Sequence, residues 1–374
     1  MRRLKKIIQH IVLFLIVMTP LYFINEASFF LNVNFIELDI FYSKLIRDIL
    51  IFLICSLLIV YHINNPYPRK ILKYLILFLF YSLLVFILGL HDPLIAFAGV
   101  RSILSLILIF LFYDLIDEAF IKKLTKILSL LLVLNLLLQI YEMFYMVPIF
   151  GLNIWGLAGR LPGFFAQPSH SGIFACFCLF FIKYYAKNNK SKHILITLAT
   201  LSIFLSMSSA AMFILFILFL FPIFLKSKYK LIWALFSILL ITLIFLNLDL
   251  LTGRLEGSSA QSGGTRVKIW KEQVDNAQLI STVFGNATNT AQNFERQLGI
   301  ENNSFVADSF YIAILVNYGV IFLLLFFCFL IYWFVKAWKT KDVAFISFLL
   351  LCMLVALSII ISEVYPMSIL MSIG

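Results

Sequence analysis

The sequence predicts an all-α polytopic membrane protein that forms a single integral membrane domain over residues 1–374. Of these 374 residues, 63% are hydrophobic and only 13% are charged, and the mean hydropathy is +1.04. Globular proteins average roughly 45–50% apolar and 25% charged residues. Apolar runs of about 17–25 residues, the length that a helix needs to cross a bilayer, recur along the chain. Soluble domains are therefore not expected.

About eleven membrane-spanning helices, within a range of roughly 10–12, account for these runs. The predicted spans are residues 7–24, 45–63, 71–90, 94–113, 127–147, 170–186, 194–208, 210–225, 231–248, 307–335 and 343–362. The fifth and sixth spans are joined by a shorter loop, residues 148–169. The ninth and tenth spans are joined by the one long polar segment, residues 249–306. Apolar side chains at helical spacing between Val267 and Ala277 predict an amphipathic helix within this long loop.

The basic residues predict which side of the membrane each connection faces. The N-terminus and the connections on its side carry 20 of the 29 lysines and arginines. These connections are residues 64–73, 122–126, 183–192, 226–230 and 336–341. Because cytoplasmic connections are enriched in positive charge, the N-terminus is predicted to be cytoplasmic and the loops 148–169 and 249–306 to lie outside. The net charge of +11 therefore reflects membrane topology, and nucleic-acid binding is not expected.

Arginines at the outer surface are the first candidates for a binding site. Arg160 lies in "GRLPGFFAQPSH", where prolines and glycines exclude a regular helix. Arg266 follows Thr265, a residue suited to cap a helix N-terminus, and Arg254 comes directly after the ninth span. Planar guanidinium groups bind phosphoryl oxygens with two hydrogen bonds, so this set predicts a site for a lipid-linked diphosphate. For a single arginine, contact with anionic lipid headgroups is the simpler alternative.

Five short motifs follow one another between residues 155 and 335. They are "RLPGFFAQPSHSG" before a span, the serine-rich break "LSMSSAAMF" between two spans, "RVKIW" and "VFGNA" in the long loop, and "DSFYIAILVNYG" opening the next span. In this order and spacing the sequence resembles the O-antigen polymerase and O-antigen ligase superfamily. The first 150 residues match it only as a series of spans.

The resemblance implies a fold similar to lipid-linked (GT-C type) glycosyltransferases, placed in the bacterial inner membrane with the active site facing the periplasm. It implies glycans carried on undecaprenyl diphosphate as substrates, and catalysis without a metal or another cofactor. Polymerases join a growing chain to the next repeat unit, whereas ligases move the finished chain to lipid A core. Ligases usually carry a histidine where this chain has Asp308, which favours a polymerase. The two functional loop arginines of the family correspond to Arg160 and Arg266, with Arg254 as an alternative for the second.

Glycosyl transfer requires stabilisation of the departing diphosphate and removal of a proton from the attacking hydroxyl. Asp308 and His170 are the leading candidates for the catalytic base, and Glu256 and Glu272 are further candidates. Asp308 could equally be a carboxylate that stabilises the first turn of its helix, and His170 could be a turn residue that bonds its own loop.

Two further residues are candidates for substrate contact. Tyr311 lies one turn beyond Asp308 on the same helix face, although tyrosines also form aromatic belts at membrane interfaces. Arg101 lies about seven residues into its span, roughly 10 Å deep. Intramembrane arginines are functional candidates, and a structural pair with Glu142 is the alternative.

The sequence supports other functions less well. A ligase shares the chemistry, and a transporter or flippase for the same lipid-linked sugar would require charged residues near the membrane midplane. The five cysteines all fall within predicted spans without zinc-ligand spacing, so no metal site is expected. The expected partners are undecaprenyl-diphosphate-linked glycans, membrane lipids and a chain-length regulator protein.

Overall fold

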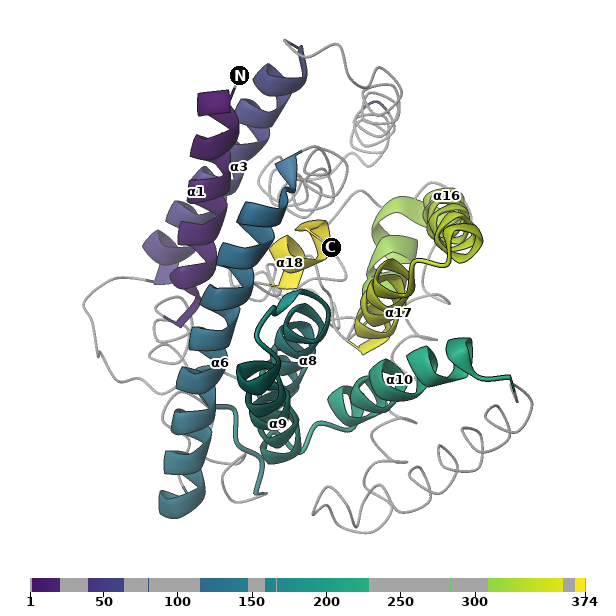
Figure 1. The fold of residues 1–374 in the computed structure, drawn as a ribbon. Coiled ribbons are helices and arrows are strands. Elements are labelled where there is room, and N and C mark those ends of the chain that lie inside the picture. Colours follow the sequence, from purple (N-terminus) through teal and green to yellow (C-terminus); the bar gives the residue numbers. More distant parts are fainter. Residues whose placement is uncertain are drawn as a thin grey trace.

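The described part of the chain consists of helices, with turns and loops but no strand. The computed structural model describes residues 2–20, 40–63, 80, 115–146, 159–165, 167–228, 283, 309–358 and 367–373. The helices, shown in Figure 1, are α1 (Arg2–Val17), α3 (Ile40–Ile63), α6 (Glu118–Tyr145), α8 (Pro168–Tyr185), α9 (Asn189–Leu205), α10 (Ser209–Lys226), α16 (Phe310–Thr340), α17 (Val343–Ser358) and α18 (Met367–Ile373). The predicted all-α class is confirmed for these residues.

Three of these helices contain segments long and apolar enough to cross a membrane, namely Ile46–Ile63, Glu118–Tyr145 and Tyr318–Thr340. Shorter apolar helices occupy Ser209–Leu225 and Val343–Leu357. All five coincide at least in part with predicted spans, as do α8 and α9. The predicted span 7–24 coincides largely with α1, whereas the predicted spans 71–90, 94–113 and 231–248 lie almost entirely outside the described residues, as does nearly all of the long loop. The total of about eleven spans and the GT-C-like arrangement therefore stay predictions.

From Leu130 to its C-terminal end, helix α6 buries polar side chains and exposes several large apolar ones. Asn135 and Gln139 are completely buried, whereas Leu130, Leu137 and Phe144 are 72%, 58% and 74% exposed. A helix in a soluble protein shows the opposite distribution, because water solvates polar groups and drives apolar ones inward. An apolar outer face around a polar interior is typical of a helix surrounded by lipid.

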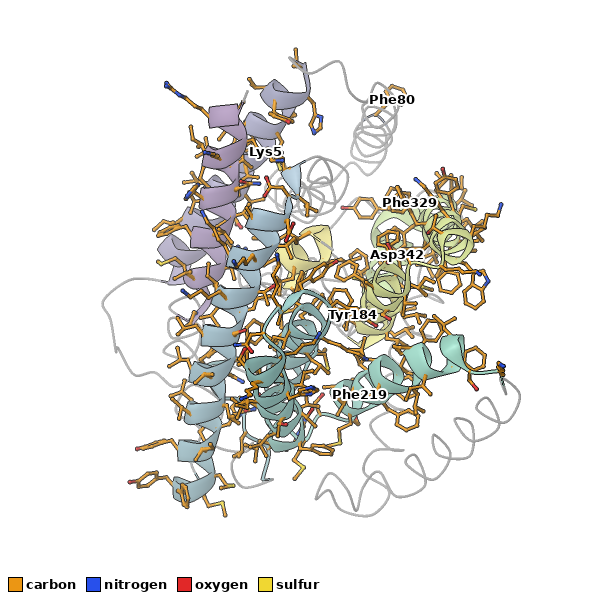
Figure 2. All side chains as sticks on the ribbon, viewed as in Figure 1. Lys5, Phe80, Tyr184, Phe219, Phe329 and Asp342 are labelled. Carbon is orange, nitrogen blue, oxygen red and sulfur yellow. The ribbon has the colours of Figure 1, made fainter. Side chains whose placement is uncertain are left out.

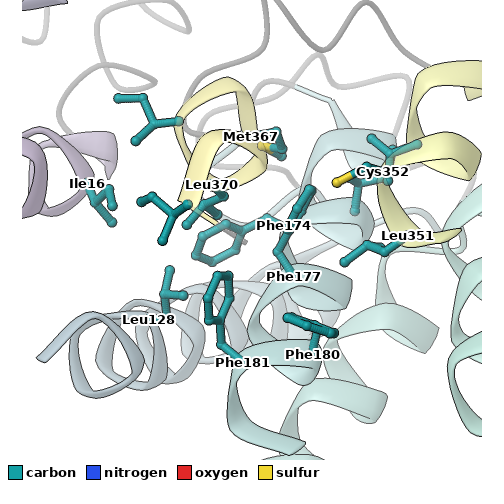
Figure 3. Packing of buried hydrophobic residues seen from close by; sticks show 14 of the residues in the cluster. Ile16, Leu128, Phe174, Phe177, Phe180, Phe181, Leu351, Cys352, Met367 and Leu370 are labelled. Atoms are coloured by element: carbon teal, nitrogen blue, oxygen red, sulfur yellow. The ribbon is translucent and has the colours of Figure 1, made fainter. Parts of the chain in front are cut away.

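Helix α8 occupies the centre of the described helices and packs against α6, α9, α10, α17 and α18. Every residue from Ile173 to Ile182 is at most 1% exposed, as expected for a helix that is apolar all round. Figure 3 shows Phe174, Phe177 and Phe181 of this helix within the buried cluster, near Leu128 of α6 and Leu370 of α18. These aromatic side chains make α8 the core against which the neighbouring helices are positioned.

Contacts between helix ends bring several segments predicted to be cytoplasmic to one end of the bundle. Lys5 of α1 forms an ion pair with Asp117, the N-cap of α6, with 3.1 Å between Nζ and Oδ2. Lys187, just after α8, pairs with Glu118 at the start of α6. The Tyr184 hydroxyl of α8 lies 2.8 Å from a serine hydroxyl near the start of α17, and Figure 2 shows Tyr184 beside that helix. These contacts agree with the alternation of sides predicted from the basic residues.

Helix α16 folds back on itself at Gly319, which divides the span predicted over residues 307–335. The Gly319 backbone has φ 76° and ψ 175°, a conformation that is essentially restricted to glycine. The rings of Tyr311 and Phe327 stack with 5.1 Å between their centroids. In a straight helix these residues would be about 24 Å apart. The segment that is long and apolar enough to cross a membrane accordingly begins at Tyr318, and the turns before it pack alongside.

Lys183 of α8 compensates for a proline inside α10. Pro222 has no N–H, so the Leu218 carbonyl one turn earlier lacks its usual helical donor. The Lys183 ammonium donates to this carbonyl oxygen at 2.7 Å, and it lies 4.9 Å from the centre of the Phe219 ring. Lys183 thereby links α8 to α10 where the α10 backbone is incomplete.

We expect Lys183→Met to lower the thermal unfolding midpoint of the detergent-purified protein, because it removes a charge-assisted hydrogen bond of about 1–3 kcal/mol. In a Pro222→Ala background the helix supplies its own N–H, so the same substitution should have a much smaller effect. Equal effects of Lys183→Met in both backgrounds would show that the bond to Leu218 contributes nothing.

Candidate functional site

A row of polar side chains on α6 faces the loop that contains Arg160. Asn135, Gln139 and Glu142 are separated by four and three residues, which places them on one face of the helix. All three side chains are completely buried. Buried polar groups are costly unless they form hydrogen bonds, so this face requires partners from the neighbouring segments.

The backbone of residues 161–164 supplies several of these partners. Gln139 donates from Nε2 to the Leu161 carbonyl oxygen at 3.0 Å. The Gly163 N–H donates to Glu142 Oε2 at 2.8 Å, and the Phe164 N–H donates to Asn135 Oδ1 at 3.2 Å. The Leu161 N–H donates to the carbonyl oxygen of α9 residue 205 at 3.1 Å. The loop therefore has a fixed conformation, held by side chains from α6 and by the end of α9.

Two serines extend the network to α8 and α9. Asn135 Nδ2 donates to Ser171 Oγ at 2.9 Å and to Ser202 Oγ at 3.2 Å. Ser202 Oγ donates in turn to Gln139 Oε1 at 2.7 Å. Both serines are completely buried. The network thus fixes α6, α8, α9 and the loop relative to one another, and such fully connected buried networks favour a single arrangement.

The loop sequence explains its conformation. Gly159 and Gly163 have φ angles of +66° and +63°, a region that favours glycine, and Pro162 cannot donate a backbone hydrogen bond. Phe164 and Phe165 are 0% exposed, and their rings stack with centroids 4.5 Å apart. These two aromatic side chains hold the loop in the core. The loop has the specific turn that the glycines and prolines of the motif predicted.

The serine-rich break between α9 and α10 closely approaches the start of α8. Met207 has φ +47°, and the Ser208 hydroxyl accepts a hydrogen bond from the Ala211 N–H at 3.4 Å, which caps α10. A Cβ at Gly172 would lie 2.7 Å from the Ala211 Cβ, closer than real contacts allow. Only a glycine at position 172 permits this approach. The motifs "RLPGFFAQPSHSG" and "LSMSSAAMF" are therefore in contact at Gly172 and Ala211.

Arg160 lies in the loop immediately before the residues that the network holds. Its side chain is partly exposed, whereas residues 161–165 are buried. The hydrogen bonds that fix the loop come from residues 161, 163 and 164 and do not involve the guanidinium group. These backbone bonds fix the residues that directly follow Arg160, whose Nε atom is buried.

His170 lies in the first turn of α8, which Pro168 opens at a position suited to proline. Its backbone N–H donates to the Gln167 carbonyl oxygen at 3.1 Å. Its ring atom Nδ1 is buried and has no hydrogen-bond partner among the described residues. The alternative in which the His170 ring bonds its own loop is therefore not seen in the part of the chain that the structure describes.

Tyr311 is largely buried between α16 and α17. Its hydroxyl donates to the Met353 carbonyl oxygen at 3.1 Å, and its ring stacks on Phe327. These contacts place it in the packing between helices, and its contact with substrate stays a prediction. The other predicted site residues lie outside the described residues; they are Arg101, Arg254, Arg266 and Asp308. Residues 148–158, the first part of the loop 148–169, also lie outside them.

Sequence reasoning missed the residues that position the loop. Asn135, Gln139, Ser171 and Ser202 were not among the candidates, and Glu142 was considered only as a partner of Arg101. A signal was present, because Asn135, Gln139 and Glu142 recur at helical spacing within an otherwise apolar span. The structure shows Glu142 accepting a bond from the Gly163 N–H.

Glu142 allows a test of this support. Glu142→Leu leaves the Gly163 N–H buried without its acceptor, which we expect to cost about 1–3 kcal/mol, whereas Glu142→Gln retains an oxygen acceptor. The leucine variant should show a lower thermal unfolding midpoint and faster proteolysis between residues 159 and 167 of the detergent-purified protein. Similar losses in both variants would mean that the negative charge, and not the hydrogen bond to the loop, determines the effect.

The region that follows the loop in the sequence matches a known protein family. Residues 193–327 match the family model described as O-antigen ligase. Neither the curated proteins nor the solved structures contain a match. The matched region begins in α9, includes α10 and ends in α16 after the fold at Gly319. The match covers about a third of the chain, agrees with the order of motifs in the sequence, and is consistent with the resemblance to the O-antigen polymerase and ligase superfamily.

Proposed function

We propose that this protein polymerises undecaprenyl-diphosphate-linked O-antigen repeat units at the periplasmic face of the bacterial inner membrane. The growing glycan is transferred from its lipid diphosphate to a sugar hydroxyl of the next lipid-linked repeat unit, without a metal ion. The observation that carries the proposal is the rigid presentation of Arg160, on a loop whose backbone is bonded to buried side chains of α6. The family match independently indicates glycan transfer.

The reaction forms a bond between the anomeric carbon and the acceptor oxygen, and it breaks the bond between that carbon and the diphosphate oxygen. Undecaprenyl diphosphate leaves with the electron pair, and a base takes the hydroxyl proton. A guanidinium held in place before the reaction stabilises the departing diphosphate without reorganisation at the moment of transfer. Arg160 takes this role, together with Arg266 or, in its place, Arg254.

Asp308 is the proposed base, with His170 as the alternative. A carboxylate at the outer surface can accept the hydroxyl proton directly. The His170 ring atom Nδ1 is buried and has no hydrogen-bond partner among the described residues, and an imidazole nitrogen can accept a proton. Tyr311 and Arg101 are proposed to contact the glycan or the lipid carrier.

A ligase is the second candidate, favoured by the description of the matched family as O-antigen ligase. It would transfer the completed glycan to lipid A core with the same departure of undecaprenyl diphosphate. The aspartate at position 308, where ligases usually carry histidine, favours the polymerase.

The lipopolysaccharide banding pattern of a strain that lacks this gene, with and without the wild-type gene restored, distinguishes these functions. A polymerase is expected to give core plus one repeat unit in the deletion strain and the full ladder after restoration. Loss of every repeat unit from the core, with polymer accumulating on the carrier, would identify a ligase. Loss of every repeat unit from the core without polymer on the carrier would favour the transporter, and an unchanged ladder in the deletion strain would exclude O-antigen assembly.

A further inference from the structure

A basic cavity lies between α1 and α6, at the end of the bundle opposite the Arg160 loop. Its volume is about 530 Å³, and its lining includes Lys5, Lys6, His10 and Lys123. We propose that this cavity binds the phosphate-bearing headgroup of an anionic membrane lipid, in the leaflet predicted to be cytoplasmic. This inference does not depend on the proposed function, because it concerns other residues at the opposite membrane surface.

Asp117, the one carboxylate among the described residues that line the cavity, is already engaged by the protein. Asp117 receives hydrogen bonds from the Phe120 N–H at 2.9 Å and from Gln9 at 3.1 Å, and it forms the ion pair with Lys5. Partial burial raises the pKa of Asp117, but these three partners outweigh burial and hold the pKa below its usual value. Asp117 is therefore ionised at neutral pH, and it neutralises one of the lysines.

The remaining lysines give the cavity a positive charge. No described carboxylate forms an ion pair with Lys6 or Lys123, which approach the cavity from α1 and α6 respectively. The His10 ring atom Nδ1 lies 2.6 Å from the Lys6 carbonyl oxygen, so it donates to that oxygen and ties the ring to the same turn. With Asp117 neutralised by Lys5, two ammonium groups are left to bind an anion, and basic pockets between helices suit lipid phosphates.

The surroundings favour a lipid over a soluble anion. The lining also includes the apolar side chains of Leu13 and Phe120, which are 8% and 2% exposed. On the outer surface of α1, Ile7 and Phe14 are 51% and 52% exposed, which marks an apolar face suited to lipid chains. A headgroup in the cavity would therefore leave its acyl chains beside an apolar helix surface.

Native mass spectrometry of the full-length protein in detergent, titrated with phosphatidylglycerol or phosphatidylcholine, tests the proposal. The wild type is expected to retain phosphatidylglycerol preferentially. The double variant Lys6→Gln/Lys123→Gln should bind it about 25-fold more weakly, at roughly fivefold for each lysine. The matched control is Lys126→Gln/Lys190→Gln, which removes two exposed lysines outside the cavity and should bind like the wild type.

Two results would overturn the proposal. Equal weakening in the cavity variant and the control would show that lipid binding follows overall charge and not this cavity. The second result is that inorganic phosphate displaces phosphatidylglycerol from the wild type when the two are present at similar concentration. If this displacement is absent in the cavity variant, the site binds a soluble anion. The unfolding midpoint of each variant, measured in the same detergent, confirms that it is folded before titration.

Discussion

In the proposed polymerase reaction, replacing Arg160 with alanine is expected to reduce O-antigen polymer about a hundredfold or more, because one charged donor to a departing anion contributes that much to catalysis. The protein should remain folded. The loop is fixed by backbone groups of residues 161–164 and by buried aromatic rings, and the guanidinium takes no part in those bonds. The measurement is the lipopolysaccharide ladder of a deletion strain complemented with the variant, at a protein level matched to the wild type.

Arg160→Lys distinguishes diphosphate binding from a general need for positive charge. Lysine keeps the charge but lacks the planar arrangement of donors that matches phosphoryl oxygens, so we expect little recovery of polymer. Arg3→Ala, a change at an exposed arginine at the opposite end of the bundle, serves as the matched control and should give a normal ladder. A normal ladder with Arg160→Lys would exclude bidentate binding, and a normal ladder with Arg160→Ala would remove Arg160 from the mechanism.

Hydropathy predicted where the described helices lie, except for α18, but local capping decided where several of them begin. The span predicted at 194–208 corresponds to α9, which starts at Asn189 because the Asn188 side chain accepts a hydrogen bond from the Lys190 N–H. The span predicted at 127–147 corresponds to α6, which starts nine residues earlier, after the Asp117 cap. A helix can continue through polar residues beyond its apolar segment. Hydropathy alone therefore predicts the position of the apolar segment but not the residue at which the helix begins or ends.

The fold of α16 at Gly319 could not be predicted from composition, because the residues on both sides of the glycine are as apolar as those of a straight span. What determines the fold is pairing between the two halves, such as Tyr311 on Phe327, and these pairs are separated by more than a dozen residues. Glycine permits the turn, but the packing selects it.

The candidate site divides in the same way. Arg160 and the irregular conformation around it could be predicted, because proline and glycine restrict the backbone locally. The side chains that hold the loop could not, because Asn135 and Ser202 come from helices whose mutual orientation appears only in the folded protein. Polar residues such as these only lower the hydropathy of a predicted span. In the structure they belong to the hydrogen-bond network that holds the backbone of the loop.

Gly163→Ala is expected to destabilise the protein by roughly 2–5 kcal/mol and to abolish polymer synthesis. The Gly163 φ angle of +63° is strained for alanine, and the added Cβ would overlap the Asn135 side-chain oxygen and lie 3.0 Å from the Asn135 backbone oxygen. The side chain of Asn135 would have to leave Ser171, Ser202 and the Phe164 N–H. The unfolding midpoint of the detergent-purified variant and the lipopolysaccharide ladder measure the two effects.

Gly159→Ala provides the matched control, because Gly159 has nearly the same φ angle, +66°, and nothing lies within 4 Å of its added Cβ. It should show only the backbone cost of about 1–2 kcal/mol, so the difference between the two variants isolates the collision with Asn135. Asn135→Ala removes the side-chain part of that collision, and Gly163→Ala should then cost less than in the wild type. Equal destabilisation by the two glycine variants would show that the loop is not held against α6 at this position, and the rigid presentation of Arg160 would lose its physical basis.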